Sequence, residues 1–172
     1  MIISLTGFMG CGKSSAGREL SELLCCPFID LDAFIEEKEG RTIPEIFSSC
    51  GEESFRSLEL AALKEIIEGH QDSDTIVLAL GGGTIMTPEC ADIVKSLTFC
   101  IYLKTSADHL ASRLSDEAAG RPLLASGDLR TRIETLLTER ASTYENTAAL
   151  TIDTDRLSVA ETALAIRANL FI

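Results

Sequence analysis

The amino-acid sequence predicts an α/β fold, a parallel doubly wound sheet flanked by helices. Two observations predict it. Short apolar runs alternate with helical patterns along the chain, and a glycine-rich loop joins the first run to the first helical pattern. Strands that alternate with helices favour parallel pairing, because each crossover returns the chain to the same end of the sheet. The chain has 172 residues without an internal repeat or low-complexity linker, so we expect a single domain over residues 1–172.

The short apolar runs are the predicted strands. Continuous apolar runs of this length are typical of buried strands. The first run, Met1–Thr6, precedes the glycine-rich loop. The remaining runs are Pro27–Asp30, Thr75–Leu80, Thr98–Leu103 and Leu150–Asp153.

Helical patterns fill the segments between the strands. A helix that begins at Ser14 is amphipathic, because Ala16, Leu20, Leu23 and Leu24 share one face. The other predicted helices are Asp32–Glu39, Glu52–Glu68, Pro88–Lys95, Ala107–Leu114, Asp128–Asn146 and Ser158–Asn169. Two segments are predicted to leave the regular core. Residues 32–60 form a helical excursion, and residues 115–125 form a polar, glycine-containing stretch that suits a mobile lid.

Composition excludes several classes of protein. A net charge of −12 argues against a broad surface for nucleic acid or anionic membrane, and no apolar stretch approaches the length of a membrane span. Six cysteines without a Cys-x-x-Cys pair, together with two histidines, do not suggest a zinc site. Most of these cysteines lie in apolar stretches, which suits reduced thiols in a cytoplasm. The first strand begins at Met1, so we expect no signal peptide. We also expect a monomer.

Residues 7–14 read Gly-Phe-Met-Gly-Cys-Gly-Lys-Ser, a complete Gly-x-x-x-x-Gly-Lys-Ser phosphate-binding loop. Glycines let successive backbone N–H groups point at phosphate oxygens, and the following helix adds the positive end of its dipole. Lys13 supplies a charge for the β- and γ-phosphates, and the Ser14 hydroxyl is suited to ligate Mg²⁺. The strand–loop–helix setting argues against a purely structural glycine turn.

Asp30 and Asp32 are the carboxylates expected to face the phosphates. They follow the second predicted strand, and the carboxyl ends of parallel strands converge on the ligand. Residues two apart in an extended chain point to the same side. The strand that ends at Leu80, by contrast, is followed by glycines and has no acid. A helix cap plus a solvated acid is the alternative, and a cap role for one residue leaves a metal role open to the other.

The acceptor side of a transfer site has two groups of candidates. Three glycines at 81–83 exceed what a turn needs and would let backbone amides approach a small substrate, although a tight turn is the alternative. Arg56 lies three residues before Glu59, a spacing that also suits a surface salt bridge. Arg121 lies in the predicted lid, and Arg140 lies on a late helix.

Together these motifs resemble the shikimate kinase family, in the nucleoside-monophosphate-kinase-like branch of P-loop proteins. The segments that carry the resemblance are the loop at 7–14, Asp-Leu-Asp (30–32), Gly-Glu-Glu-Ser-Phe-Arg-Ser-Leu-Glu (51–59), Leu-Gly-Gly-Gly (80–83), Arg-Pro-Leu-Leu (121–124) and Arg-x-x-x-Tyr (140–144). They span nearly the whole chain, in the family's order and spacing. The resemblance implies a three-layer P-loop kinase with a five-stranded parallel sheet, Mg²⁺ as cofactor, and ATP-dependent phosphorylation of the 3-hydroxyl of shikimate.

The resemblance also implies a role for each candidate residue. Lys13, Asp32 and Arg121 would be catalytic, with Asp32 accepting a hydrogen bond from the acceptor hydroxyl and Arg121 closing over the transferring phosphate. Ser14 and Asp30 would hold Mg²⁺. The ATP-binding residues would be Gly10, Cys11, Gly12, Lys13, Ser14, Ser15, Arg113, Arg121, Asp153 and Thr154. The shikimate-binding residues would be Asp32, Phe47, Phe55, Arg56, Glu59, Gly81, Gly82, Gly83 and Arg140.

Other functions stay open at this point. A gluconate-type or other hydroxy-acid kinase of the same fold would need a similar carboxylate clamp, and only the Phe-Arg and Arg-Pro-Leu-Leu segments favour shikimate. A nucleoside monophosphate kinase is disfavoured, because the sequence has no recognisable elements for a second base. A nucleotide-binding module without transfer activity is a further alternative, against which the combination of Lys13, Asp30, Asp32 and Arg121 argues.

Overall fold

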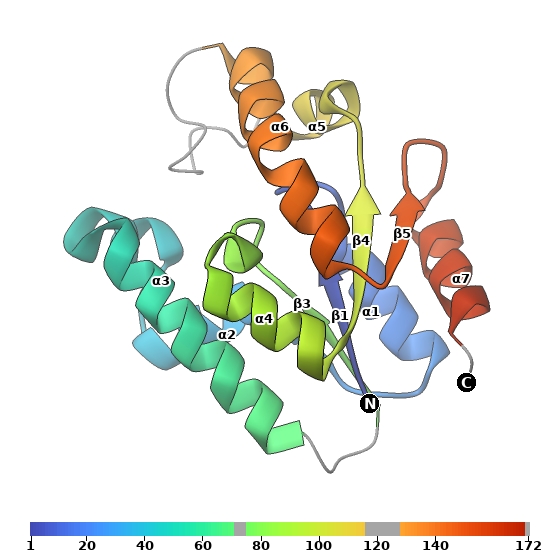
Figure 1. The fold of residues 1–172 in the computed structure, drawn as a ribbon, viewed down its shortest axis with the longest axis horizontal. Helices are drawn as coiled ribbons and strands as arrows, with labels where there is room; N and C mark the ends of the chain where they lie inside the picture. Colours follow the sequence, from blue (N-terminus) through green and yellow to red (C-terminus); the bar gives the residue numbers. More distant parts are fainter. Residues whose placement is uncertain (71–74, 116–127, 171–172) are drawn as a thin grey trace.

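The computed structural model describes residues 1–70, 75–115 and 128–170 and confirms the predicted fold class. Its centre is a five-stranded, all-parallel sheet in the order β2-β3-β1-β4-β5 (Figure 1). The strands are β1 (Ile2–Thr6), β2 (Phe28–Asp30), β3 (Ile76–Ala79), β4 (Phe99–Lys104) and β5 (Leu150–Asp153). Every observed strand end lies within one residue of its predicted position.

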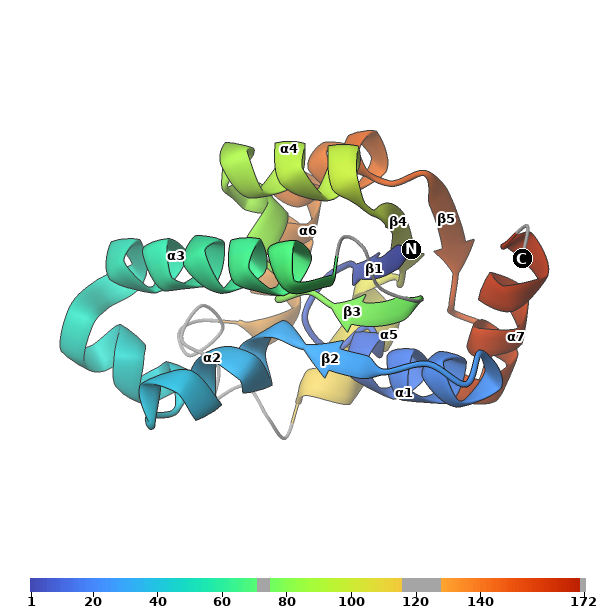
Figure 2. The ribbon, with the colours of Figure 1, turned by 90° about the horizontal axis from the view of Figure 1, so that it is seen from below.

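Helices cover both faces of this sheet, which makes the three layers of the fold (Figure 2). Within the described residues they are α1 (Lys13–Leu23), α2 (Leu31–Glu39), α3 (Ile43–His70), α4 (Pro88–Leu97), α5 (Ala107–Leu114), α6 (Leu129–Thr147) and α7 (Val159–Asn169), with a short 3₁₀ helix at Thr84–Met86. Helices α1 and α7 lie on one side, and α3, α4 and α6 lie on the other. None of the helices in the described parts of the chain is long and apolar enough to cross a bilayer.

Strand β1 supplies both halves of the core, because successive side chains of a strand point to opposite faces of the sheet. Ile3 and Leu5 belong to the cluster with residues of α1 and α7, whereas Ile2 belongs to the cluster with residues of α3 and α4. All five residues of β1 are buried, which is typical of the central strand of a parallel sheet.

Helix α3 differs most from its predicted bounds, since it begins at Ile43 rather than at Glu52. Its first turn is held by a reciprocal cap, in which the Thr42 N–H donates to the Glu45 carboxylate and the Glu45 N–H donates to the Thr42 hydroxyl. Gly51 then interrupts the helix with φ 79° and ψ 173°, a conformation nearly restricted to glycine. The element is therefore two helical segments joined at a kink, and the second of them carries Arg56 and Glu59.

The site is built where the carboxyl ends of the strands meet. The phosphate-binding loop follows β1, Asp30 ends β2, and the three glycines follow β3. Because β2, β3 and β1 are consecutive neighbours in the parallel sheet, these loops emerge side by side. Of the predicted lid at 115–125, only Ser115 belongs to the described residues; the remainder, including Arg121, lies outside them.

Candidate active site

The loop after β1 has the backbone that phosphate binding requires. Gly10 and Gly12 have φ values of 80° and 95°, in the left-handed region that favours glycine, and Gly12 is the N-cap of α1. The Lys13 side chain is buried and folds back over the loop, where its Nζ donates to the carbonyls of Gly7 (2.9 Å) and Phe8 (3.0 Å). The helix N-terminus and the ammonium group therefore converge on one concave surface, which suits polyphosphate.

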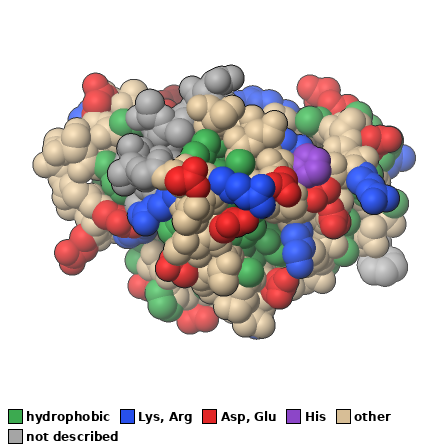
Figure 3. All heavy atoms as spheres, turned by 90° about the horizontal axis from the view of Figure 1, so that it is seen from above, with side chains coloured by type: hydrophobic (Ala, Val, Ile, Leu, Met, Phe, Trp, Pro, Cys, Tyr) green, Lys and Arg blue, Asp and Glu red, His purple; other side chains and the backbone are tan. Residues whose placement is uncertain are grey.

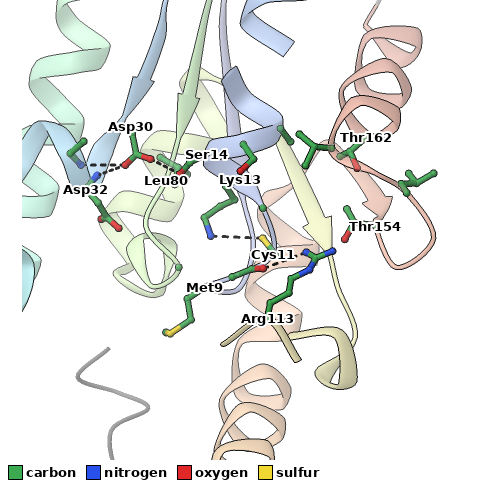
Figure 4. Close-up of a pocket in the computed structure, with 18 of the residues that line it drawn as sticks. Met9, Cys11, Lys13, Ser14, Asp30, Asp32, Leu80, Arg113, Thr154 and Thr162 are labelled. Carbon is green, nitrogen blue, oxygen red and sulfur yellow. Dashed lines mark hydrogen bonds between the residues drawn. The ribbon is translucent and has the colours of Figure 1, made fainter. Parts of the chain in front are cut away.

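A pocket of about 820 Å³ opens over this loop (Figure 4). Its lining includes most of the residues predicted to bind nucleotide or metal, namely Gly10, Cys11, Gly12, Lys13, Ser14, Ser15, Asp30, Arg113 and Thr154. Asp32 and Gly82, which were predicted to bind the acceptor, also line it. Met9, Glu36 and the N-terminal part of α7 complete the wall, and sequence reasoning did not single them out. Asp153 is not among the lining residues; its carboxylate instead accepts the N–H of Asp155 within the loop.

Asp30 and Ser14 form the pair that suits a magnesium ion. The Ser14 hydroxyl donates to Asp30 Oδ2 at 2.5 Å, while the other carboxylate oxygen caps α2 by accepting the N–H groups of Asp32 and Ala33. Asp30 is therefore the helix cap, and its second oxygen lies beside the Ser14 hydroxyl. Mg²⁺ takes oxygen ligands, keeps several waters and relies on substrate phosphates, so one carboxylate beside one hydroxyl is a fitting donor set. No cluster of three acidic, histidine or cysteine side chains suited to a metal occurs in the described parts of the chain.

The environment of Asp32 perturbs its carboxyl group strongly. Burial raises the pKa of its carboxyl to about 6, and the neighbouring carboxylates of Glu59 and Asp30 add to the rise while Lys13 opposes it. A carboxyl with this pKa is mostly ionised at neutral pH and is still a useful base. It lies between the phosphate-binding loop and the three glycines, because it lines the pocket and also approaches Gly81.

Arg56 and Glu59 form a partly buried pair on α3. Arg56 Nη1 donates to Glu59 Oε2 at 2.7 Å, and its Nη2 donates to the exposed Glu52 at 3.3 Å. Glu59 is fully buried, and its second oxygen accepts the Thr84 hydroxyl at 2.5 Å. Thr84 was not predicted from the sequence, although its position directly after the three glycines was the available signal. The buried Glu59 therefore holds the Arg56 guanidinium in place, and the pair is not a surface salt bridge.

Each glycine of residues 81–83 is tightly approached by a different neighbour. A Cβ atom on Gly81 would lie 2.8 Å from the Glu59 carboxylate and 2.9 Å from that of Asp32. On Gly82 it would lie 2.9 Å from the backbone nitrogen of Met9, and on Gly83 it would lie 2.6 Å from the Arg56 guanidinium. Real Cβ atoms are essentially never found at such distances, so neighbouring groups of the protein itself require glycine at all three positions.

Arg140 reaches the same turn from the opposite side. It is buried, its Nη1 donates to the Gly82 carbonyl at 3.3 Å, and its guanidinium lies over the Phe8 ring at 5.8 Å. Phe47 and Phe55, both expected to bind shikimate, lie in tilted contact with ring centroids 4.8 Å apart; Phe55 belongs to the buried core and Phe47 packs against it. Two guanidinium groups, from α3 and α6, thus flank the three glycines.

The far end of the pocket lies between α5 and the loop after β5. Arg113 Nη1 donates to the Gly10 carbonyl at 3.4 Å, and the buried Thr154 hydroxyl is hydrogen-bonded to Thr105 at 2.6 Å. Asp155 accepts the Ser106 N–H at 2.9 Å and so ties the two segments together. Arg113 and Thr154 therefore line the pocket on the side predicted to hold adenine.

A phosphate-binding loop at the centre of a parallel sheet, with a carboxylate base candidate and anchored arginines beside it, defines a phosphotransferase of the P-loop class. The model of the family described as "Shikimate kinase" matches residues 9–170. The chain belongs to the shikimate kinase family.

Individual relatives agree with this assignment. The chain is 41% identical to a shikimate kinase of Thermus thermophilus over 159 residues, which cover 92% of this chain and 84% of the relative. A shikimate kinase of Enterococcus faecalis is 38% identical, with 92% of both chains covered. Among solved structures, the shikimate kinase of Acinetobacter baumannii in complex with shikimate matches with a TM-score of 0.90 and 35% identity, covering 96% of this chain and 90% of that one.

Proposed function

We propose that the protein transfers the γ-phosphate of ATP to the 3-hydroxyl of shikimate, giving shikimate 3-phosphate and ADP. The observation that carries this proposal is the pair of guanidinium groups at the glycine turn. Arg56 lies against Gly83 and Arg140 donates to the Gly82 carbonyl, directly beside Asp32 and the phosphate-binding loop. Two guanidinium groups suit the carboxylate of a small acid, and the loop suits ATP. Family membership and the neighbour solved with shikimate support the same substrate.

The residues divide the chemistry between them. Lys13 and the amides of residues 10–15 would bind the phosphates, and Arg113 with Thr154 would line the adenine. Asp32 would accept the proton of the 3-hydroxyl as its oxygen attacks the γ-phosphorus and the bond to the bridging oxygen of ADP breaks. Ser14 and Asp30 would hold Mg²⁺, which neutralises phosphate charge when bound. Arg121, known from the sequence only, would contribute a further charge over the transferring group.

The organisation of the whole chain is part of the proposal. Residues 1–172 would form one kinase domain, with a shikimate-binding segment at about 32–60 and a lid at about 115–125. We propose a monomer in the cytoplasm, which the thiol state of the cysteines supports: all six lie in described parts of the chain and all are free.

The direct test is an ADP-release assay with shikimate and gluconate as parallel acceptors. We expect turnover of shikimate and little or none of gluconate. Turnover of gluconate alone would replace the proposal with the related hydroxy-acid kinase. ATP binding without turnover of either acid would leave a nucleotide-binding module.

The Lys13→Met variant separates transfer from binding. Losing one charge that stabilises the transferring group should lower kcat by about 10²–10³-fold. Single-turnover measurements of this variant, beside its circular dichroism spectrum as a folding control, would show the effect. Near-normal kcat in a folded Lys13→Met variant would remove Lys13 from its proposed role.

A further inference from the structure

Tyr144, which closes the Arg-x-x-x-Tyr segment of α6, makes a strong contact with the glycine turn. Its hydroxyl donates a 2.5 Å hydrogen bond to the backbone carbonyl of Gly82. Its ring is fully buried and stacks on Tyr102 with a centroid distance of 5.0 Å. Burial raises the pKa of the Tyr144 hydroxyl above its usual range, so the group stays protonated and remains a donor.

Arg140 shares the same carbonyl. It lies one helical turn before Tyr144, and its Nη1 reaches the Gly82 oxygen at 3.3 Å, a longer bond than the 2.5 Å bond of Tyr144. The Gly82 carbonyl therefore accepts hydrogen bonds from both side chains, and the tyrosine makes the shorter one.

The sharing of one carbonyl matters when an acid binds. A guanidinium that turns towards a carboxylate gives up part of its contact with Gly82. Gly82 is partly buried, so its carbonyl left without a donor would carry part of its desolvation cost, and this cost would oppose the movement. The Tyr144 hydroxyl continues to satisfy the carbonyl and so removes this opposition. Gly82 itself has little freedom to adjust, because its Cα faces the backbone of Met9 closely.

We propose that Tyr144 is a positioning residue for the acid substrate: it holds the Gly82 carbonyl so that Arg140 can leave it for the substrate carboxylate. This inference rests on the proposed function, in which Arg140 binds that carboxylate. Tyr144 acts through Arg140 and does not touch the reacting atoms.

The Tyr144→Phe variant tests this, because it keeps the stacked ring and removes only the hydroxyl. We expect the KM for shikimate to rise about 3- to 10-fold, with kcat within about twofold and the KM for ATP unchanged, as for a loss of uniform substrate binding. Calorimetric titration with shikimate in the absence of ATP should give the same rise in Kd. Unchanged shikimate affinity in a folded Tyr144→Phe protein would overturn the inference.

Tyr102→Phe is the matched control. Tyr102 is the other ring of the stacked pair, and within the described parts of the chain its hydroxyl makes no hydrogen bond to the glycine turn. A purely structural role of the pair predicts similar losses of thermal stability in both variants and no specific change in shikimate binding. An equal rise in KM for shikimate in both variants would also contradict the proposal.

A double-mutant cycle identifies the residue through which Tyr144 acts. In the Arg140→Ala background, Tyr144→Phe should cause no further rise in KM for shikimate, because no guanidinium remains to be released. A full additional 3- to 10-fold rise would show that Tyr144 acts independently of Arg140 and would overturn the inference. Suppose that the parent phosphorylates shikimate and that Arg140→Ala raises the KM for shikimate. An unchanged KM in Tyr144→Phe then overturns the role of Tyr144 and leaves the proposed function intact. If the parent does not phosphorylate shikimate, the proposed function fails as well.

Discussion

The side chain of Asp32 is suited to act as a base, and its ionisation lowers the stability of the folded protein. Burial, together with the nearby carboxylates of Glu59 and Asp30, raises the pKa of its carboxyl from 3.8 to about 6. A raised pKa means that the folded protein holds the proton more tightly than the unfolded chain does. Asp32 therefore costs stability once it ionises, and the cost is complete above about pH 6. Such a cost is common where function needs a base beside other carboxylates.

We expect Asp32→Asn to raise stability while abolishing most activity. In metal-free protein at pH 7 the gain should be about 1–3 kcal/mol, since one unit of pKa shift corresponds to about 1.4 kcal/mol and Asp32 is partly exposed. The gain should be small near pH 4 and should grow as the pH rises to about 6, where the parent carboxyl ionises. Urea unfolding at several pH values measures this, with the exposed Asp92→Asn on α4 as the control. A variant less stable than its parent at pH 7 would contradict the account of Asp32.

Thr6 shows a second local cost, at the end of β1. Its side chain is fully buried, and its hydroxyl has no hydrogen-bond partner among the residues that the structure describes. A buried hydroxyl without a partner costs about 1–3 kcal/mol. Valine has the same branched shape without the hydroxyl, so Thr6→Val should stabilise the protein by roughly this amount.

The control for Thr6→Val is the same substitution at Thr105, which is also buried but whose hydroxyl bonds to Thr154 at 2.6 Å. Thr105→Val should destabilise by about 1 kcal/mol. Thermal unfolding of both variants provides the measurement. Stability changes of the same sign in the two variants would rule out the hydrogen-bond explanation.

At the scale of elements, the turn after β3 is the junction of the site. Its three glycines contact α2 and α3, the phosphate-binding loop, and the arginines of α3 and α6. The 3₁₀ helix that follows then supplies Thr84 to Glu59. A side chain at any of these glycines would displace a specific neighbour. Substitutions at these positions should therefore distinguish effects on acid binding from effects on nucleotide binding.

Gly83→Ala should weaken the binding of shikimate and leave the binding of ATP unchanged. Its φ of −112° is open to alanine, so the backbone is not strained, but the added Cβ would displace the Arg56 guanidinium 2.6 Å away. Losing a charge-assisted contact of about 1.5–3 kcal/mol should raise the KM for shikimate about 10- to 100-fold with little change in the KM for ATP. Steady-state kinetics with each substrate varied in turn would measure this. Gly69→Ala on α3, where nothing lies within 4 Å, is the control and should be neutral to slightly stabilising. Equal increases in both KM values would indicate a general distortion of the turn.

At the scale of the molecule, a binding site for anions lies inside an acidic protein. The net charge is −12, from 27 acidic and 15 basic residues. On the face seen in Figure 3, acidic and basic side chains are interspersed over the surface. Several basic side chains of the site lie beneath this surface, since Lys13 and Arg140 are buried and Arg56 is partly buried. The site therefore depends on short-range contacts rather than on a positive field of the whole protein.

This charge imbalance predicts stabilisation by salt. Like charges repel within the compact state, and 0.2 M salt shortens the screening distance to below about 10 Å. Raising NaCl from 20 to 200 mM at pH 7 should therefore raise Tm by a few degrees, and KCl should do the same. A fall in Tm with both salts would mean that attractive surface pairs, such as Lys64–Glu89 and Lys104–Glu145, outweigh the repulsion.

The sequence by itself determined the elements and the nucleotide half of the site. Apolar runs, helix caps and the glycine-rich loop act over a few neighbouring residues, so each strand and the residues of the loop could be located from local pattern. The first segment of α3 was predicted only as part of the helical excursion at 32–60 and without its start, because the cap formed by Thr42 and Glu45 is a weaker local signal than an apolar run.

The tertiary structure decided what the residues of the acceptor half do to one another. Thr84 and Glu59 are separated by 25 residues, Arg140 and Gly82 by 58, and Tyr144 and Gly82 by 62. No local pattern contains such pairs, and the raised pKa of Asp32 likewise depends on burial and on the distant Glu59. Hydrogen bonding, burial and Coulomb interactions depend on distance in space rather than along the chain. The sequence could therefore provide the candidates, and only the fold could show which of them share a hydrogen bond.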